Sequence, residues 1–277
     1  MKFQIDHDLH IHSYISPCVA HDPRQTKEAI LAYGLTNNFG LLCVTDHIWD
    51  SKVKSVKGNW WVNLGLDFEK AKEILPLPQS EKCRFLFGIE ADMDYLGNVG
   101  ISKEEYNTFD FIILSPSHLH AEGFARDGAK VGKTAAEYKA FYKERLLQIL
   151  NMDLPFQKCG LAHFTSCLTC EEGEFAAIDR FADEEFREIF GLAAKRGIGI
   201  ELNVWDFATK YTHEERESIL RPYRIAKEMG CKFYLGGDAH KPEEFMPRKE
   251  EWQFLVDTLE LTEDDKLPFV KENIAKL

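Results

Sequence analysis

The feature that most constrains this chain is a series of seven short apolar runs, each followed closely by a histidine or a carboxylate. We expect each run to be a buried strand, because short apolar runs between turn residues are typical of parallel sheets. The runs with their polar residues are Phe3–Leu9 (His10, His12), Leu41–Val44 (Asp46, His47), Phe85–Ile89 (Glu90), Phe111–Leu114 (His118), Leu161–Ala162 (His163), Ile198–Ile200 (Glu201) and Phe233–Leu235 (Asp238, His240). In a parallel β/α barrel all strand ends converge on one face, so the pattern predicts one cluster of metal ligands.

Helical periodicity separates these runs, which is the alternation expected for parallel strands joined by crossover helices. Gly230 is a candidate C-terminal cap of the expected helix Glu214–Met229, and Pro222 is expected to kink or split that helix. No repeat or linker divides the sequence, so we expect a single domain over residues 1–277. The expected helices are Thr26–Ala32, Phe68–Leu75, Ala135–Leu150, Glu184–Arg196, Glu214–Met229 and Glu250–Leu259, with a short one after Pro268.

The net charge of the chain limits the kinds of molecule that it is expected to bind. The chain carries 46 Asp and Glu against 34 Lys and Arg, for a formal net charge of −12. Long nucleic acids are therefore not expected as partners, because they need a basic surface. A small anionic substrate is compatible with this charge, since bound cations reverse the local potential.

Cysteine usage and hydropathy bear on the compartment. Seven cysteines at irregular spacing indicate reduced thiols rather than a disulfide framework. No apolar run approaches the roughly 20 residues that span a bilayer, and the first residues lack the core of a signal peptide. We expect a cytoplasmic protein without a membrane partner, and the sequence predicts no oligomeric state.

Two pairs of candidate ligands share the same spacing. His10 and His12 lie two residues apart in an expected strand, so both imidazoles point to the same face. Imidazoles held in this way can bind zinc, iron or manganese. Asp238 and His240 repeat the spacing with one carboxylate and one imidazole. These two pairs and Glu90 all follow expected strands. Their joint arrangement favours the interpretation that they bind metal over the alternative that they only hydrogen-bond to one another at a polar rim.

Seven short motifs follow one another in order from about residue 5 to residue 240. They are Asp8-Leu9-His10-Ile11-His12-Ser13, Thr45-Asp46-His47, Gly88-Ile89-Glu90, Ser117-His118, Ala162-His163, Glu201-Leu202-Asn203 and Gly237-Asp238-Ala239-His240. This ordered set resembles the motifs of the PHP (polymerase and histidinol phosphatase) family. The resemblance implies a distorted (β/α)7 TIM-like barrel with its metal site at the carboxyl ends of the strands. It also implies two or three divalent metal ions (zinc, iron or manganese) that hydrolyse phosphoesters.

The same resemblance implies three groups of ligands. One ion would take His10, His12, Glu90 and Asp238, a second would share Glu90 and add His118 and His163, and a third would take His47 and His240. Ions about 3.5–4 Å apart share a water and lower its pKa towards about 7, which yields a hydroxide able to attack phosphorus. Asp238 or His240 would pass a proton to the leaving group as the catalytic acid.

Cys18 departs from the family pattern, because phosphatase members often have a histidine at this position. A thiolate can bind zinc or iron, so Cys18 is a candidate ligand of the third ion. The alternative is a buried thiol beside a weak third site, and His21 is a further candidate. His120 likewise competes with His118.

Several other residues have open roles. Asp46 is expected to orient an imidazole, whereas Glu201 and Asn203 either support the ligands, contact substrate or are structural. Arg126 is the candidate for binding phosphate oxygens, because its guanidinium makes a bidentate fork.

Two further groups leave alternatives open. Cys167 and Cys170, with Cys159 nearby, are a weak candidate for a separate zinc or redox site. Trp60 and Trp61 lie in a long connection and either shape substrate access or pad the rim.

The expected function is the metal-dependent hydrolysis of a small phosphomonoester, with histidinol phosphate as a candidate substrate. The alternatives are a phosphodiesterase or nuclease acting on nucleotides or oligonucleotides, an amidohydrolase-like metal hydrolase, and a non-catalytic metal-binding module. Amidohydrolase-like barrels commonly place a coordinating lysine after a middle strand, and the corresponding runs here have none.

Overall fold

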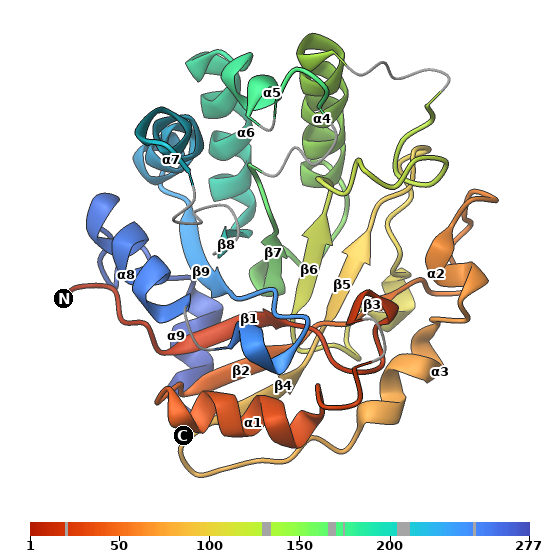
Figure 1. Ribbon diagram of the computed structural model, residues 1–277, viewed down its shortest axis with the longest axis vertical. Helices are drawn as coiled ribbons and strands as arrows, with labels where there is room; N and C mark the ends of the chain where they lie inside the picture. The colour runs from red at the N-terminus through yellow and green to blue at the C-terminus, as the bar shows by residue number, and fades with distance from the viewer. Residues whose placement is uncertain (20–21, 129–133, 166–169, 174, 204–210, 246–247) are drawn as a thin grey trace.

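The computed structural model describes residues 1–19, 22–128, 134–165, 170–173, 175–203, 211–245 and 248–277. Within these ranges the strands form two parallel sheets, which confirms the α/β class (Figure 1). The three-stranded sheet has the order β1 (His7–Ile11), β2 (Leu41–Val44), β4 (Arg84–Phe87). The six-stranded sheet has the order β3 (His47–Ile48), β5 (Ile89–Asp92), β6 (Ile112–Ser115), β7 (Cys159–Leu161), β8 (Gly199–Asn203), β9 (Lys232–Gly236).

Each of the seven apolar runs overlaps a strand, and the chain itself joins the two sheets. After β2 it runs directly into β3, and after β4 directly into β5. At the other edge the N–H of Asp238 donates to His10 O over 2.6 Å, and the N–H of His12 donates to Ala239 O over 3.2 Å. The end of β9 therefore lies beside β1, although the assigned strand pairings form two sheets rather than one closed ring.

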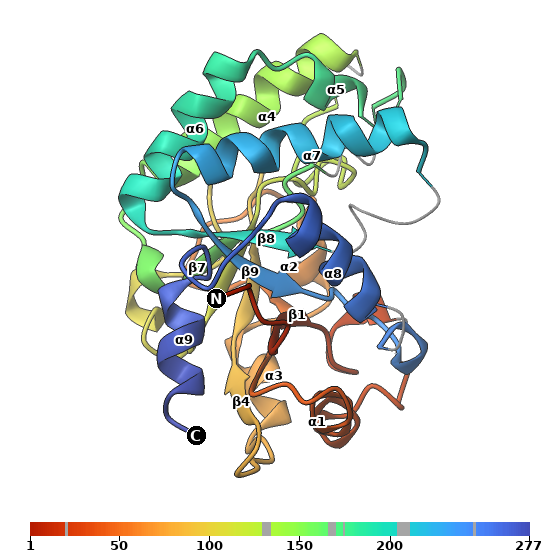
Figure 2. The same ribbon diagram turned by 90° about the vertical axis from the view of Figure 1, so that its left-hand side faces the viewer.

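The helices lie on both sides of the strands. Helices α4, α5, α6 and α7 gather on one side, at the top of Figure 2, whereas α1 and α3 lie on the other. Their bounds are α1 Lys27–Thr36, α2 Trp60–Asn63, α3 Phe68–Ala71, α4 Ala135–Leu150, α5 Ala176–Asp179, α6 Asp183–Arg196, α7 His213–Glu228, α8 Arg248–Thr258 and α9 Pro268–Ile274. Within the described ranges every helix is too short or too polar to cross a lipid bilayer.

Pro222 was expected either to kink helix α7 or to split it. The helix is continuous through Pro222, so the alternative of a split is wrong. Proline removes only one N–H from the helix ladder, and the buried face that includes Ile219 and Tyr223 holds both halves against the core. The expected cap at its end is confirmed, because Gly230 adopts a left-handed φ of 81° that suits glycine.

Side chains on the two faces of the strands pack into separate hydrophobic clusters. In β2, Leu42 and Val44 join the large cluster between sheets and helices, whereas Leu41 joins a second cluster on the opposite face. Helix α9 packs on this second cluster, with the rings of Phe269 and Phe111 5.0 Å apart. Leu41 and Phe111 lie at the amino ends of their strands, so α9 covers the end opposite the candidate ligands.

Candidate metal centre

Glu90 of β5 lies at the centre of a ring of five imidazoles. Its Oε2 atom lies 3.3, 3.3 and 3.2 Å from the Nε2 atoms of His10, His12 and His47, and its Oε1 atom lies 3.6 and 3.4 Å from those of His118 and His163. The carboxylate is fully buried. Its two oxygens face different histidines, which is the arrangement that a carboxylate shared between two cations needs.

Asp238 supplies a second carboxylate to the same cluster from the loop after β9. Its Oδ1 atom lies 3.1 Å from His12 Nε2 and 3.4 Å from His10 Nε2, while Oδ2 lies 3.6 Å from His163 Nε2. The ring of His240 lies 4.5 Å from that of His12. These residues therefore meet at the carboxyl ends of the strands.

Several overlapping triplets bring their ligand atoms within 4.8 Å of one another. They are His12–Cys18–His47, His10–His163–Glu201, His10–His12–Glu90, His12–Asp238–His240 and His47–Glu90–His118. All nine predicted metal ligands occur in these groups. Imidazole, carboxylate and one thiol form a donor set that fits zinc, iron or manganese.

Cys18, the candidate ligand of the third ion, lies among the histidines, grouped with His12 and His47. Burial raises the pKa of its thiol, but His12, His240 and His47 outweigh burial and lower it well below its ordinary value. The Sγ atom lies 3.0 Å from Ser16 Oγ. His21, the other candidate, lies outside the described residues.

Most of these imidazoles are held from behind through Nδ1. His10 Nδ1 lies 2.6 Å from Glu201 Oε1, and His163 Nδ1 lies 3.0 Å from Ser117 Oγ. Such partners fix the ring and leave Nε2 free to face the cluster. His12 Nδ1 is the exception: it is buried and has no hydrogen-bond partner in the described part of the chain.

Asp92 is a functional candidate that the sequence analysis missed. Its Oδ2 atom lies 2.8 Å from His47 Nδ1, and its Oδ1 atom lies 2.5 Å from His118 Nδ1. Asp92 therefore orients two imidazoles at once. Its spacing could have indicated this role, because Asp92 lies two residues after Glu90 and therefore on the same face of β5.

Asp46, which was expected to orient an imidazole, has hydrogen bonds elsewhere. It accepts hydrogen bonds from the N–H of Ser13 over 2.7 Å and from the Ser13 hydroxyl over 2.5 Å. Its carboxylate thus fixes the turn that follows β1. Glu201 holds His10, and the Asn203 amide donates to Glu201 Oε2 over 3.2 Å, so both support the ligands.

The backbone is strained at two candidate ligands that follow strands β7 and β9. His163 and Asp238 adopt left-handed φ angles of 40° and 48°. Non-glycine residues hold this conformation only where the surroundings enforce it, and such residues cluster at functional sites. The Glu201 carboxylate also lies close against the backbone of Gly236. A Cβ on Gly236 would lie 1.9 Å from Glu201 Oε1, so only glycine leaves room for that carboxylate.

The carboxylates give the cluster a strongly negative potential. Burial alone would lower the pKa of His10, but the charges of Asp238 and Glu201 outweigh burial and hold it well above its ordinary value. Burial also acts on His12, yet Cys18 and Asp238 raise its pKa to about 10. At His163 burial and the neighbouring His118 instead lower the pKa to about 4. A potential that holds protons on His10 and His12 favours divalent cations in their place.

A cavity of about 400 Å³ opens onto this cluster. Trp61 stacks on His47 with ring centroids 4.2 Å apart and an angle of 11°, so it is a wall of the cavity rather than rim padding. Exposed His120 occurs in none of the ligand groups, whereas His118 faces Glu90. The lining residues are Cys18, His47, Trp60, Trp61, Leu64, Asp92, His118, His120, Ala121, Phe124, Asp238 and His240.

Arg126, the candidate for phosphate binding, is buried and is not among the residues that line this cavity. Its Nε donates to Leu119 O over 3.2 Å, and its Nη2 donates to Glu122 Oε2 over 3.1 Å. A role in substrate binding stays a prediction. The candidate cysteine site cannot be placed, because Cys167 lies outside the described residues; Cys159 is buried in β7.

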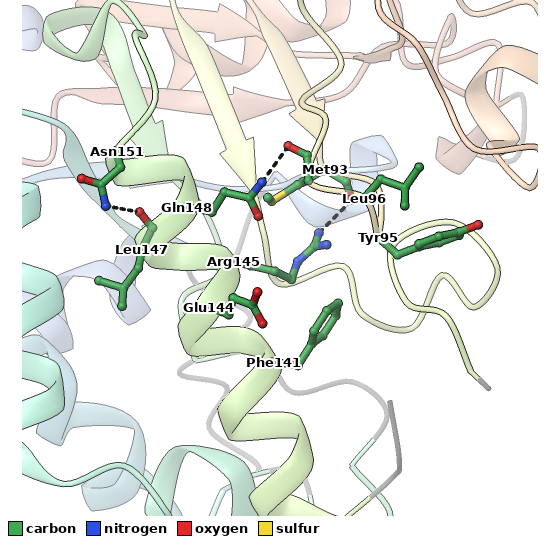
Figure 3. A pocket seen from close by; sticks show the side chains of 10 residues that line it. Met93, Tyr95, Leu96, Phe141, Glu144, Arg145, Leu147, Gln148 and Asn151 are labelled. Carbon is green, nitrogen blue, oxygen red and sulfur yellow. Dashed lines mark hydrogen bonds between the residues drawn. The ribbon is translucent and has the colours of Figure 1, made fainter. Parts of the chain in front are cut away.

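Arg145 of α4 is a second residue that the sequence analysis passed over. Its buried guanidinium donates to the carbonyls of Pro116, Asp94, Ala125 and Met93 over 2.7–3.0 Å. Figure 3 shows the side chain reaching from α4 towards Met93, beside a surface cavity of about 440 Å³. Met93 directly follows Asp92, so Arg145 anchors the backbone next to the residue that orients two imidazoles.

Neither a protein-family model nor a curated protein sequence matches the chain. Among solved structures, the histidinol phosphate phosphatase of Lactococcus lactis subsp. lactis, crystallised with zinc, L-histidinol and phosphate, has a TM-score of 0.57 at 16% identity, covering 93% of this chain and 94% of that one. A Listeria monocytogenes protein proposed to be a histidinol phosphatase has a TM-score of 0.59 at 17% identity, covering 89% of this chain and all of that one. At these identities the likeness establishes a shared fold.

Proposed function

We propose that this chain is a metal-dependent phosphoesterase that hydrolyses a small phosphomonoester, such as one like histidinol phosphate. The observation that carries the proposal is the buried Glu90 carboxylate between five imidazoles, with Asp238 beside it. The fold is shared with a phosphatase crystallised with zinc and phosphate, which supports this class of reaction. The hydrogen bonds between β1 and the end of β9 support a single distorted (β/α)7 barrel over residues 1–277.

Two or three divalent cations would be held by residues already grouped around Glu90. His10, His12 and Asp238 would hold one cation, His118 and His163 a second, and His47, His240 and Cys18 a third. Bound there, the cations would neutralise phosphoryl oxygens and lower the pKa of a water nucleophile to about 7.

The protein's own part is to hold the ligands and to move a proton. Glu201, Asp92 and Ser117 fix the imidazole rings from behind, so that little reorganisation is needed during reaction. Asp238 or His240 is the candidate acid for the leaving alkoxide, and His240 can act in this way only where it does not hold the third cation, because its Nε2 cannot bind a cation and carry the proton at once. Its Nδ1 lies 2.7 Å from Asp238 O, and its side chain is 32% exposed, so it is open to the cavity.

Replacing His12 with alanine tests the proposal directly. We expect the metal-loaded wild type to release phosphate from p-nitrophenyl phosphate, and His12→Ala to lose that release together with bound metal. Phosphate release and elemental analysis on the same preparations measure both. His213→Ala, an exposed position on α7, is the matched control. Full activity in a metal-free His12→Ala protein would refute the mechanism, and faster cleavage of phosphodiesters or amides would favour those reactions instead.

Asp92→Asn should weaken metal binding without removing any ligand. The amide keeps the shape of the side chain but loses the charge that two Nδ1–H groups share, so we expect about a 10–100-fold loss of metal affinity. Competition with a chelator measures this loss, and Asp67→Asn at the half-buried N-cap of α3 serves as control. Unchanged affinity would show that Asp92 does not act through His47 and His118.

A further inference from the structure

Helix α2 presents apolar side chains to solvent beside the metal centre. Trp60, Val62 and Leu64, in this helix and its C-terminal cap, are 41%, 49% and 57% exposed. Trp60 and Leu64 lie four residues apart, hence on one side of the helical turn, and both line the cavity. Exposed apolar residues gathered at a cavity mark a binding surface more often than chance.

The apolar wall begins at the candidate ligands themselves. Trp61 lies flat against His47, and the ring of Trp60 lies 6.4 Å from that of Trp61. His120 lies across from Trp60, with ring centroids 6.4 Å apart at an angle of 59°. Aromatic surface therefore extends without interruption from a candidate metal ligand to the outer part of the cavity.

A second wall is the turn of residues 121–124, of which Ala121 and Phe124 line the cavity. This turn is held tightly against the segment before α2. A Cβ on Gly58 would lie 2.4 Å from Gly123 O, so the two backbones are in contact only because residue 58 is glycine. The side chain of Asn59 caps α2 by accepting from the N–H groups of Trp61 and Val62 over 3.0 and 3.3 Å.

A small hydrophobic cluster supports both walls from beneath. Its members are Trp49, Val56, Trp61, Leu66, Ala121, Phe124 and Ala125. The surface around Trp60 is thus preformed rather than assembled by a ligand, which reduces the ordering that binding would require.

We propose that α2 and the turn of residues 121–124 form a subsite for the leaving group, which selects phosphomonoesters of alcohols that carry an aromatic ring. This inference rests on the proposed function. With the phosphoryl group at the metal centre, the ester oxygen faces the cavity and the organic group must lie along the wall of Trp60 and Leu64. A flat ring stacks on this wall, whereas a second phosphate group gains little from it. None of the described residues that line the cavity is lysine or arginine.

The experiment compares two substrates that differ only in the ring. Ethyl phosphate and 2-phenylethyl phosphate both release a primary alkoxide, so chemical reactivity is matched. We expect the metal-loaded wild type to favour 2-phenylethyl phosphate by about tenfold in kcat/KM, in keeping with the burial of one aromatic ring. Trp60→Ala should bring this ratio close to one, and Trp60→Phe should keep most of it. Val62→Ala is the matched control, because Val62 is an exposed apolar residue of α2 outside the cavity lining.

A binding measurement separates this proposal from the proposed function. Calorimetry of the metal-loaded protein with ethylphosphonate and 2-phenylethylphosphonate, which are not hydrolysed, should show the same tenfold preference. That preference in a protein that hydrolyses no phosphomonoester would uphold the subsite and refute the phosphatase. Hydrolysis of both esters with a ratio near one, or a ratio that Trp60→Ala leaves unchanged, would refute the subsite alone.

Discussion

Glu90→Gln is expected to lower the rate of phosphate release by at least about 10³-fold and to reduce the metal content of the purified protein. Glutamine keeps the size of the side chain but removes the charge that faces five imidazoles. A metal contributes several kcal/mol of charge stabilisation in the transition state, and each 1.36 kcal/mol is about a factor of ten in rate. Burial raises the pKa of Glu90, but His47, His10 and His118 lower it well below its ordinary value, so it is the anionic form that is lost.

Elemental analysis and p-nitrophenyl phosphate turnover test this result together. Glu228→Gln on α7 is a suitable control, because that side chain is 61% exposed. A Glu90→Gln protein with wild-type metal content and rate would show that the carboxylate is not shared between cations. Loss of metal with an unchanged circular dichroism spectrum would place the defect in the site rather than in the fold.

Arg145→Met is expected to lower the free energy of unfolding by about 3–5 kcal/mol. Methionine fills part of the space but takes the donor from the carbonyls of Pro116, Ala125 and Met93, whereas Asp94 O keeps the N–H of Gly97, and each buried unsatisfied group costs about 1–3 kcal/mol. Burial lowers the pKa of Arg145 to about 10, so the guanidinium stays charged at neutral pH.

Urea unfolding followed by tryptophan fluorescence measures this change. Arg187→Met on α6 provides the comparison, because its side chain is 43% exposed and should change stability by no more than about 0.5 kcal/mol. Arg145→Lys should fall between the two, since one ammonium cannot reach four carbonyls from three segments. A wild-type midpoint for Arg145→Met would contradict the anchoring role.

The strands and the ligand positions could be predicted from sequence because both depend on local patterns. An apolar run of strand length identifies a buried strand, and the residue that ends it lies at the edge where parallel strands converge. Two-residue spacing then places His10 with His12 on one face. Positions such as Glu90 and Asp238 follow from the same rule, although their roles as ligands stay predictions.

What the sequence could not show are contacts set by tertiary packing. Arg145 reads as an ordinary helical residue, because nothing nearby in sequence indicates that four carbonyls from other segments surround it. Asp46 directly precedes His47 and invited the role of an orienting residue, yet the turn after β1 brings Ser13 to it instead. The continuity of α7 through Pro222 likewise reflects packing of the whole helix rather than a local preference.

Two adjacent glycines have a consequence for protein engineering. A Cβ on Gly236 would strike the Glu201 carboxylate, and a Cβ on Gly237 would lie 2.4 Å from Asp8 Oδ2. Copying the nine candidate ligands onto another scaffold would therefore not reproduce their arrangement, because it also depends on two positions that have no side chain.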